Sequence, residues 1–554
     1  MKMAIIAPPY PLEEAPAPPL GVTYVAAACE AAGAEVRIFD YIVSRYTKEK
    51  FEEELGRFPA DVVGATSVTM NFFGALRIIQ DAKSIDPGVV TVMGGPHVTF
   101  DAVETLRRYP DVDIIVMGEG EETVRELVPI LDGGGDLSTV RGIAFRSDGG
   151  IVVTEARELI RDLDSLPLPA RHLLPISRYR ALGFPVSIIT SRGCPNSCIF
   201  CLGRRMVGKR VRHRSAVAVV DEIEHILSYG FSRVNVADDI FTANPEKVSA
   251  VCREIRRRDV RFTWSAFSRV NTVTPEMLAE MRDAGCDAVS FGIESGNPDM
   301  LKRVKKGITL KQARNAVQMC KGEGVLAHAS FIVGLPGETA ETLEDTRSFA
   351  ESLGILYGFH FLAPFPGTTV REDIDRYDLE ILTDDWDRYD ANSAIVRTSS
   401  LSAEEMNRFV ADLETKHRAN WEASLQRYYE GTASGKEYIS VEGQLRTKII
   451  FKILSEDLVE RFGTIDPIRR ADDSDDAVDM FCENVAAAVG GDRDLAARTI
   501  RDLVDRGLIA FRSKGERTTW FWTPCGRASA ERPHPKESTV TPVALHEASA
   551  YRLA

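Results

Sequence analysis

Three cysteines stand within eight residues near the middle of the chain: Cys194, Cys198 and Cys201, spaced C-x3-C-x2-C. Three thiolates on one loop can hold three irons of a 4Fe–4S cluster and leave the fourth iron open, whereas a purely electron-carrying cluster usually takes four cysteines. Structural zinc, the main alternative, needs four ligands, and only His213 stands near enough in sequence to serve as the fourth. The spacing therefore predicts an iron–sulfur cluster with one open iron.

The cysteines follow directly after a strand-like run that opens a series of alternating strands and helices. The six strand-like runs of this series are VSIITSR, RVNVAD, RFTWSAF, DAVSFGIE, HASFIVG and ILYGFHFL. Six parallel strands with helices between them favour an incomplete (β/α) barrel, whose chemistry gathers at the carboxyl ends of the strands. The cysteine loop lies at such an end, after the first strand.

The cysteine spacing, with the aromatic Phe200 before the last cysteine and a partial barrel behind it, resembles the radical SAM superfamily. The resemblance implies that the open iron binds S-adenosylmethionine, and that one electron from the cluster cleaves it to a 5'-deoxyadenosyl radical. It further implies that Arg269 and Ser268 bind the methionyl carboxylate and that Glu294 binds the ribose hydroxyls. Gly334 and Phe200 complete the expected contacts to S-adenosylmethionine. A structural ion pair between Glu294 and Arg269, and a simple turn role for Gly334, are the alternatives.

The first 130 residues show another alternation of strand-like and helix-like runs, with helices expected near 22–32 and 73–85. This pattern predicts a doubly wound parallel sheet, which binds ligands in the turns that follow its strands. With Pro18-Pro19-Leu20-Gly21 near its start and the turns Gly94-Gly95-Pro96-His97 and Gly118-Glu119-Gly120-Glu121, the domain resembles the cobalamin-binding module of B12-dependent radical SAM proteins. The residues that this resemblance assigns to cobalamin are Thr66, Ser67, Gly94, Gly95, His97, Gly118, Glu119 and Gly120.

The module lacks the Asp-x-His-x-x-Gly pattern that supplies a histidine to cobalt, and His97 stands in a different context. We therefore expect cobalt without a histidine ligand from this domain. A domain that kept its fold but lost cobalamin is the alternative.

The full domain assignment follows from these patterns and from changes in composition. We predict a cobalamin-binding-like domain over 1–138, a linker over 139–185, a radical SAM partial barrel over 186–395, a mostly helical domain with a winged-helix-like unit over 396–525, and a mobile tail over 526–554. The fold class is thus α/β with a helical C-terminal region.

The net charge and the composition limit the kinds of partner that we expect the protein to bind. A net charge of −14 disfavours broad binding to nucleic acid, because phosphate contacts need clustered basic residues. The short apolar N-terminal run is cut by prolines, and no stretch approaches the ~18 apolar residues of a membrane span, so a cytoplasmic protein is expected. The basic run from Arg204 to Arg214 is either a solvated face or an attractor for an anionic substrate.

The leading functional hypothesis is a cobalamin-dependent radical methyltransferase that acts on an unactivated carbon. A radical cyclase or carbon-skeleton enzyme without methyl transfer is the alternative, and a corrinoid or redox sensor a remote one. A methylthiotransferase is disfavoured because the first domain has Cys29 alone. A small-molecule, lipid, tetrapyrrole or peptide substrate fits the sequence equally well, and flavodoxin or ferredoxin is the expected electron donor.

Overall fold

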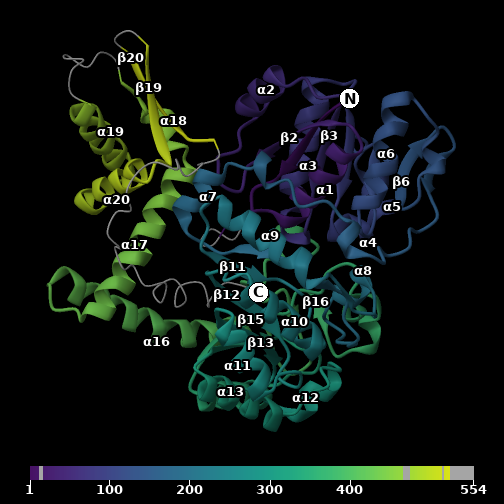
Figure 1. Ribbon diagram of the computed structural model, residues 1–554. Coiled ribbons are helices and arrows are strands. Elements are labelled where there is room, and N and C mark those ends of the chain that lie inside the picture. Colours follow the sequence, from purple (N-terminus) through teal and green to yellow (C-terminus); the bar gives the residue numbers. More distant parts are fainter. Residues whose placement is uncertain (11–15, 466–473, 515–516, 525–554) are drawn as a thin grey trace.

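The computed structural model describes residues 1–10, 16–465, 474–514 and 517–524 of the chain. In Figure 1 a first α/β domain (purple to blue) lies above a second one (teal), and a mostly helical region (green to yellow) lies to the left of both. The segment 526–554, for which we predicted a mobile tail, lies outside the described residues.

The first domain is built on a seven-stranded sheet of order β2-β1-β3-β4-β5-β6-β7, in which β1 to β5 are parallel. Its strands are β1 (Lys2–Ala7), β2 (Glu35–Asp40), β3 (Val62–Thr66), β4 (Val90–Gly94), β5 (Ile114–Val116), β6 (Ile143–Ser147) and β7 (Gly150–Val153). Its helices are α1 (Leu20–Ala31), α2 (Lys48–Arg57), α3 (Phe72–Ile85), α4 (Pro96–Phe100), α5 (Ala102–Arg108) and α6 (Glu121–Gly133). Apolar side chains of α1 and α6 cover one face of the sheet and those of α2 to α5 cover the other. The predicted doubly wound sheet is confirmed.

The segment 139–185, for which we predicted a linker, divides into two parts. Its first part forms the hairpin β6–β7, and β6 pairs antiparallel with β5, with Val116 opposite Ile143. The strand β5 has only three residues and would otherwise leave a bare sheet edge, so the hairpin completes the first domain. Only the rest of the segment, with the short helix α7 (Ile176–Leu182), connects the domains.

The second domain contains the six predicted parallel strands, in the order β15-β14-β13-β12-β11-β8. They are β8 (Val186–Ile188), β11 (Arg233–Val236), β12 (Thr263–Ser268), β13 (Cys286–Glu294), β14 (Leu326–Val333) and β15 (Leu356–Phe361). The helices between them are α8 (Gly203–Val207), α9 (Ala216–Ser228), α10 (Pro245–Arg257), α11 (Pro275–Asp283), α12 (Pro298–Arg303), α13 (Leu310–Glu323) and α14 (Ala340–Leu353). A sheet of this order and direction, with its helices on one face, is the predicted partial barrel.

Helix boundaries follow local signals in the sequence. The Thr309 hydroxyl caps α13 by accepting from the Gln312 amide, and the Gln312 side chain accepts from the Thr309 amide in return. The helix ends at Gly324 in the left-handed conformation. Asn244 caps α10, with Pro245 as the first helical residue. Such caps satisfy the free amides of the first turn, and they fix where each helix leaves the strand before it.

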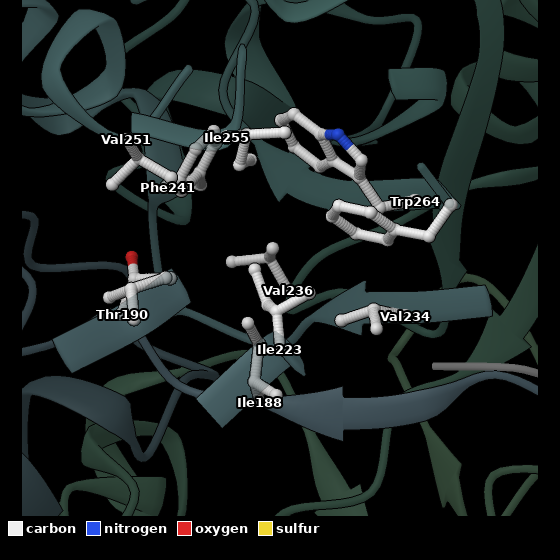
Figure 2. Close-up of a pocket in the computed structure, with 11 residues that line it drawn as sticks. Ile188, Thr190, Ile223, Val234, Val236, Phe241, Val251, Ile255 and Trp264 are labelled. Carbon is white, nitrogen blue, oxygen red and sulfur yellow. The ribbon is translucent and has the colours of Figure 1, made fainter. Parts of the chain in front are cut away.

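The faces of the barrel sheet differ in chemistry. One face packs against α9 and α10 and encloses a cavity of about 10 Å³ lined by apolar side chains and Thr190, including Trp264, Val236 and Ile223 (Figure 2). That volume is near the minimum for one water molecule, so this face is core. The opposite face carries the alternate residues of the strands, such as Asn235 and Ser265, whose side chains hydrogen-bond at 3.0 Å. This inner face is polar and only partly buried.

The C-terminal region is mostly helical, as predicted. It comprises α16 (Ala403–Tyr429), α17 (Gly435–Ser455), α18 (Leu458–Phe462), α19 (Ser474–Val489) and α20 (Arg493–Asp505), with β18 (Thr464–Ile465), β19 (Ile509–Lys514) and β20 (Arg517–Trp522). The antiparallel pair β19–β20 follows α20 directly. Among the described residues no helix combines the length and apolarity needed to cross a membrane.

Candidate functional site

The cysteine loop, residues 193–211, leaves the end of β8 and is closed at its base by a two-stranded ladder. The strands β9 (Ser191–Arg192) and β10 (Arg212–His213) pair antiparallel, with Arg192 opposite Arg212. Gly193 has a φ of +116°, and a Cβ there would collide with the carbonyl oxygen of Arg210, so only glycine fits. Backbone pairing between β9 and β10 therefore holds the two ends of the loop together.

Two acidic residues at the end of β11 hold the start of this loop. Asp238 is buried and accepts from the Thr190 amide (2.6 Å), the Thr190 hydroxyl (2.5 Å) and the Ser191 hydroxyl (2.7 Å). Asp239 accepts from the Gly193 amide at 3.1 Å. These carboxylates support the loop from the neighbouring strand.

Each of the three cysteine sulfurs receives an N–H donor. The Asn196 amide lies 3.5 Å from Cys194 Sγ, the Gly203 amide 3.4 Å from Cys201 Sγ, and Arg269 Nη1 3.8 Å from Cys198 Sγ. Donors to sulfur stabilise thiolates and tune the potential of a cluster. The other five cysteines of the described residues are buried and none stands close in sequence to another, whereas these three are not fully buried.

The donor set fits an iron–sulfur cluster. Burial raises the pKa of the Cys201 thiol, with smaller contributions from Cys198 and Cys194, so the three sulfurs share one environment. No three His, Cys, Asp or Glu side chains of the described chain converge on a single metal ion. A four-iron cluster distributes its ligands over several irons, so its cysteines need not converge in that way.

Of the predicted S-adenosylmethionine residues on the cysteine loop and at the ends of β12 and β13, all but one gather beside the cysteines. Arg269 Nη1 contacts Cys198 Sγ, and its Nη2 donates to the carbonyl of Lys306. Glu294 ends β13 with its side chain buried, and Phe200 lies 5.9 Å from the Lys306 ammonium. Ser268 is the exception, because its hydroxyl is bonded to Thr242 on the helix-facing side of β12.

The ion partner of Glu294 is Lys306, and not Arg269 as the structural alternative assumed. Lys306 Nζ lies 2.6 Å from Glu294 Oε1, and both side chains are buried. Sequence reasoning missed Lys306, since it stands in a loop between α12 and α13 where no motif marks it. Only the fold brings Lys306 to the cysteine loop.

Gly334 directly follows β14 and has a φ of +91°, and a Cβ there would stand 2.9 Å from Val396. Glu338 holds this turn by accepting from the Gly334 amide (2.5 Å) and the Leu335 amide (3.3 Å). Burial raises the pKa of Glu338 to about 8, against the effect of these bonds. Its Oε1 is buried without a hydrogen-bond partner among the described residues.

The predicted cobalamin residues lie at the carboxyl ends of β3, β4 and β5. Thr66 ends β3, and the Ser67 amide donates to the carbonyl of Gly94 at 2.8 Å. A Cβ on Gly95, whose φ is +105°, would collide with the Ser67 carbonyl. Gly118 has a φ of +72° and faces open space, and Gly120 precedes α6. The open space at Gly118 and the glycine-bearing turns at these strand ends fit a large ligand such as cobalamin, because they give it access to the backbone.

His97 is enclosed by the protein. Its ring lies 4.3 Å from that of Phe72 and 5.0 Å from that of Trp386, and its Nδ1 is 3.2 Å from the Thr69 hydroxyl. Burial lowers the pKa of His97 to about 4. It is the one histidine in residues 1–138, and its Nε2 is buried without a hydrogen-bond partner among the described residues.

Glu119 has a partner that the sequence did not suggest. Its carboxylate lies 3.2 Å from Arg192 and 2.8 Å from Arg212, the two residues at the base of the cysteine loop. Hydrogen bonding from Arg212 and the charge of Arg192 outweigh burial and lower the pKa of Glu119. The turn after β5 therefore joins the two α/β domains at the cysteine loop.

The basic run after the cysteines divides in two. Arg212 and Arg214 are largely buried and paired with Glu119 and Glu222. Arg204, Lys209 and Arg210 are exposed, without an ion pair in the described part of the chain. The exposed part extends from α8, which contacts α4 of the first domain where Arg205 stacks 6.0 Å from Phe100 (Figure 1).

Two family models match the chain. The radical SAM superfamily model matches residues 188–350, and the B12 binding domain model matches residues 14–128. The chain is 35% identical over 396 residues to an uncharacterized methyltransferase of Pyrococcus horikoshii, covering 71% of this chain and 86% of that protein.

The chain is also similar in sequence to a cyclase and in structure to a cobalamin-dependent radical enzyme. The chain is 34% identical over 344 residues to the anaerobic magnesium-protoporphyrin IX monomethyl ester cyclase of Rubrivivax gelatinosus, covering 60% of this chain and 62% of that enzyme. The structure of the cobalamin-dependent S-adenosylmethionine radical enzyme OxsB, with aqua-cobalamin and S-adenosylmethionine bound, shares the fold. Its TM-score is 0.66 at 16% identity, over 91% of this chain and 83% of that one.

Proposed function

Since this chain belongs to the radical SAM superfamily and joins that domain to a B12-binding domain, we propose that it is a methyltransferase acting on an unactivated carbon. Its cofactors are a 4Fe–4S cluster, S-adenosylmethionine and cobalamin. When bound, they supply an electron to cleave S-adenosylmethionine and a methyl group for transfer. The observation that carries the proposal is the contact of Glu119 with Arg192 and Arg212, since it places the B12-binding domain against the cluster loop.

Three side chains of the barrel have the chemistry to hold S-adenosylmethionine beside the cluster. Arg269 and Lys306 are two cations next to Cys198 and Phe200, suited to a carboxylate. Glu294 uses Oε1 for Lys306, and we propose that Oε2 accepts from a ribose hydroxyl. The Gly334 turn offers backbone to the remaining part of the cofactor.

The inner face of the barrel sheet is the proposed place of the methyl acceptor. The strand register puts Ser330 beside Gly358 and Ile332 beside His360 on this face. Burial lowers the pKa of His360, and its Nε2 has no hydrogen-bond partner among the described residues. Phe267 is 37% exposed at the end of β12. Tyr357 stacks with Phe331 and Phe359 on the opposite face, away from the acceptor.

Radical SAM enzymes need a reductant, and we propose flavodoxin or ferredoxin. No acidic residue occurs from Cys201 to Val220, although the whole chain carries a net charge of −14. The exposed Arg204, Lys209 and Arg210 complement an acidic electron carrier. The rate of cluster reduction by such a carrier should fall as salt is added, because salt screens exposed charges.

The proposed reaction is tested by the products of S-adenosylmethionine. A methyltransferase of this kind consumes two molecules per turnover, because one gives its methyl group and leaves S-adenosylhomocysteine, and the other leaves methionine and 5'-deoxyadenosine. A cyclase, which the similarity to the Rubrivivax enzyme supports as the second candidate, leaves 5'-deoxyadenosine without S-adenosylhomocysteine. Anaerobic reconstituted protein, incubated with methyl-labelled S-adenosylmethionine, cobalamin and a host extract, separates them. Absence of S-adenosylhomocysteine during turnover would contradict methyl transfer.

A further inference from the structure

The base of the cluster loop holds two arginines side by side. Arg192 and Arg212 are opposite each other in the β9–β10 ladder, and their side chains are only 10% and 9% exposed. Like charges directly opposite each other destabilise a ladder, and burial raises that penalty. The ladder can close the loop only if carboxylates neutralise both guanidinium groups.

Those carboxylates come from the first domain. Glu119 Oε1 accepts from Arg192 (3.2 Å) and from Arg212 (2.8 Å), and its Oε2 accepts from Arg212 (2.9 Å) and the Ile160 amide (2.8 Å). Glu121 accepts from the other terminal nitrogen of Arg192. Two cations and two anions thus form a closed, buried set in which every charge has a partner.

The turn that supplies these carboxylates has a second face. Gly118 precedes Glu119, adopts a φ of +72° and faces open space at the end of β5, among the residues assigned to cobalamin. Glu121 begins α6 on the other side of Gly120. Glu119 and Glu121 therefore reach the arginines of the cysteine loop with their side chains, while Gly118 and Gly120, which alternate with them, are among the residues assigned to cobalamin.

We propose that Glu119 and Glu121 are positioning residues that anchor the base of the cluster loop to the B12-binding domain, and so set the place and charge environment of the cluster beside cobalamin. This inference rests on the proposed function, since it requires both cofactors in one protein. Neither glutamate touches a reacting atom in this assignment.

The reduction potential of the cluster tests the charge part of the inference. The net charge around a cluster sets its potential. Glu119→Gln removes a negative charge and should raise the potential, and Arg212→Gln removes a positive charge and should lower it. A merely structural role would loosen the loop in both variants and shift the potential in the same direction. Equal or same-direction shifts would therefore overturn the inference. Glu126→Gln is the matched control, because Glu126 lies on α6, which follows Glu119 in the chain, but pairs with Arg157, and it should leave the potential unchanged.

Proteolysis of the protein without cofactors tests the anchoring part. Trypsin cuts after arginine and lysine, and the loop exposes Arg204, Arg205, Lys209 and Arg210. Cleavage in this loop should be several-fold faster in Glu119→Gln, and to a smaller degree in Glu121→Gln, than in the wild type and Glu126→Gln, because local opening exposes the backbone. Glu121→Gln leaves all contacts of Glu119 in place, so this variant replaces Glu119→Gln in the test if Glu119→Gln does not fold.

The two proposals fail in different ways. If the wild-type protein took up no cobalamin or iron, the proposed function would fail, while the proteolysis comparison would still measure the anchor. If both cofactors bound but the variants were cut no faster than Glu126→Gln, the anchor would be refuted and the proposed function would stand.

Discussion

Lys306 Nζ lies 2.6 Å from Glu294 Oε1 in a buried ion pair at the carboxyl end of β13. Gly292 makes room for it, since a Cβ there would collide with the Glu294 carboxylate and stand 3.1 Å from Lys306 Nζ. Glu294 also adopts a φ of +73°, a conformation that costs a non-glycine residue about 1–3 kcal/mol and gathers at functional sites. The pair is thus held in place by its surroundings.

Removing one partner of this pair should affect stability and cofactor binding separately. Glu294→Gln leaves a buried ammonium unpaired and should lower the free energy of unfolding by about 3 kcal/mol. It should also weaken S-adenosylmethionine binding and slow 5'-deoxyadenosine formation about a hundredfold, because the reacting carbon is misplaced. The double variant Glu294→Gln, Lys306→Gln should regain much of the stability and keep the defect in binding. Normal affinity in the double variant would show that Glu294 does not hold the ribose.

The three loop cysteines should each be required for the cluster. The anaerobically purified protein should hold about four irons and four sulfides per chain. Replacing Cys194, Cys198 or Cys201 by Ala should abolish this content in iron and sulfide assays. Cys286→Ala is the control, because Cys286 is buried in β13 and should not change the iron content. Full iron in all three loop variants would refute the assignment.

His97 should not serve as a ligand of cobalt. His97→Phe keeps an aromatic ring between Phe72 and Trp386, so the protein should fold and take up cobalamin with an unchanged absorption spectrum. The paramagnetic resonance spectrum of reduced, bound cobalamin should show no histidine nitrogen in either protein. A nitrogen splitting that disappears in His97→Phe would contradict this prediction.

Gly95 should be needed for cobalamin uptake. Gly95→Ala forces a Cβ against the Ser67 carbonyl and distorts the junction of β3 and β4. The control is Gly33→Ala, since Gly33 also has a positive φ (+93°) but meets nothing within 4 Å. Both variants should lose about 1–2 kcal/mol of stability from the backbone conformation. Only Gly95→Ala should lose cobalamin uptake in a spectral titration, and equal uptake by both would remove Gly95 from the site.

Glu338 should make stability fall with rising pH. Its pKa is about 8 in the folded protein against 4.5 in the unfolded chain, so between these values the folded state binds a proton that the unfolded state does not. The free energy of unfolding then decreases by about 1.4 kcal/mol per pH unit from this group. Glu338→Gln keeps an acceptor for the Gly334 and Leu335 amides and lacks this titration. In denaturant unfolding from pH 5 to 8.5, the free energy of unfolding of the variant should rise relative to that of the wild type as pH rises. If the two free energies changed with pH in parallel, the raised pKa of Glu338 would be contradicted.

The sequence by itself determined the two α/β domains and the six parallel strands of the barrel, and it predicted the cluster cysteines. Alternation of apolar residues is a local property, and so are the caps that begin α10 and α13. The cysteines could be predicted because all three lie within one loop, where residues close in sequence are also close in space. That His97 is enclosed by Phe72 and Trp386 was not predicted, because Trp386 lies far from it in sequence.

Only the tertiary structure decided which distant charges meet. Lys306 reaches Glu294 because a loop after α12 folds back over β13, and Glu119 reaches Arg192 and Arg212 because two domains pack together. The hairpin β6–β7 likewise joined the first sheet because β5 left an edge to pair. Ion pairs and sheet edges depend on distances in space, and residues 12 to 93 positions apart carry no spacing signal for them. Local patterns therefore predicted which residues bind the cofactors, and packing decided which distant side chains lie beside those residues.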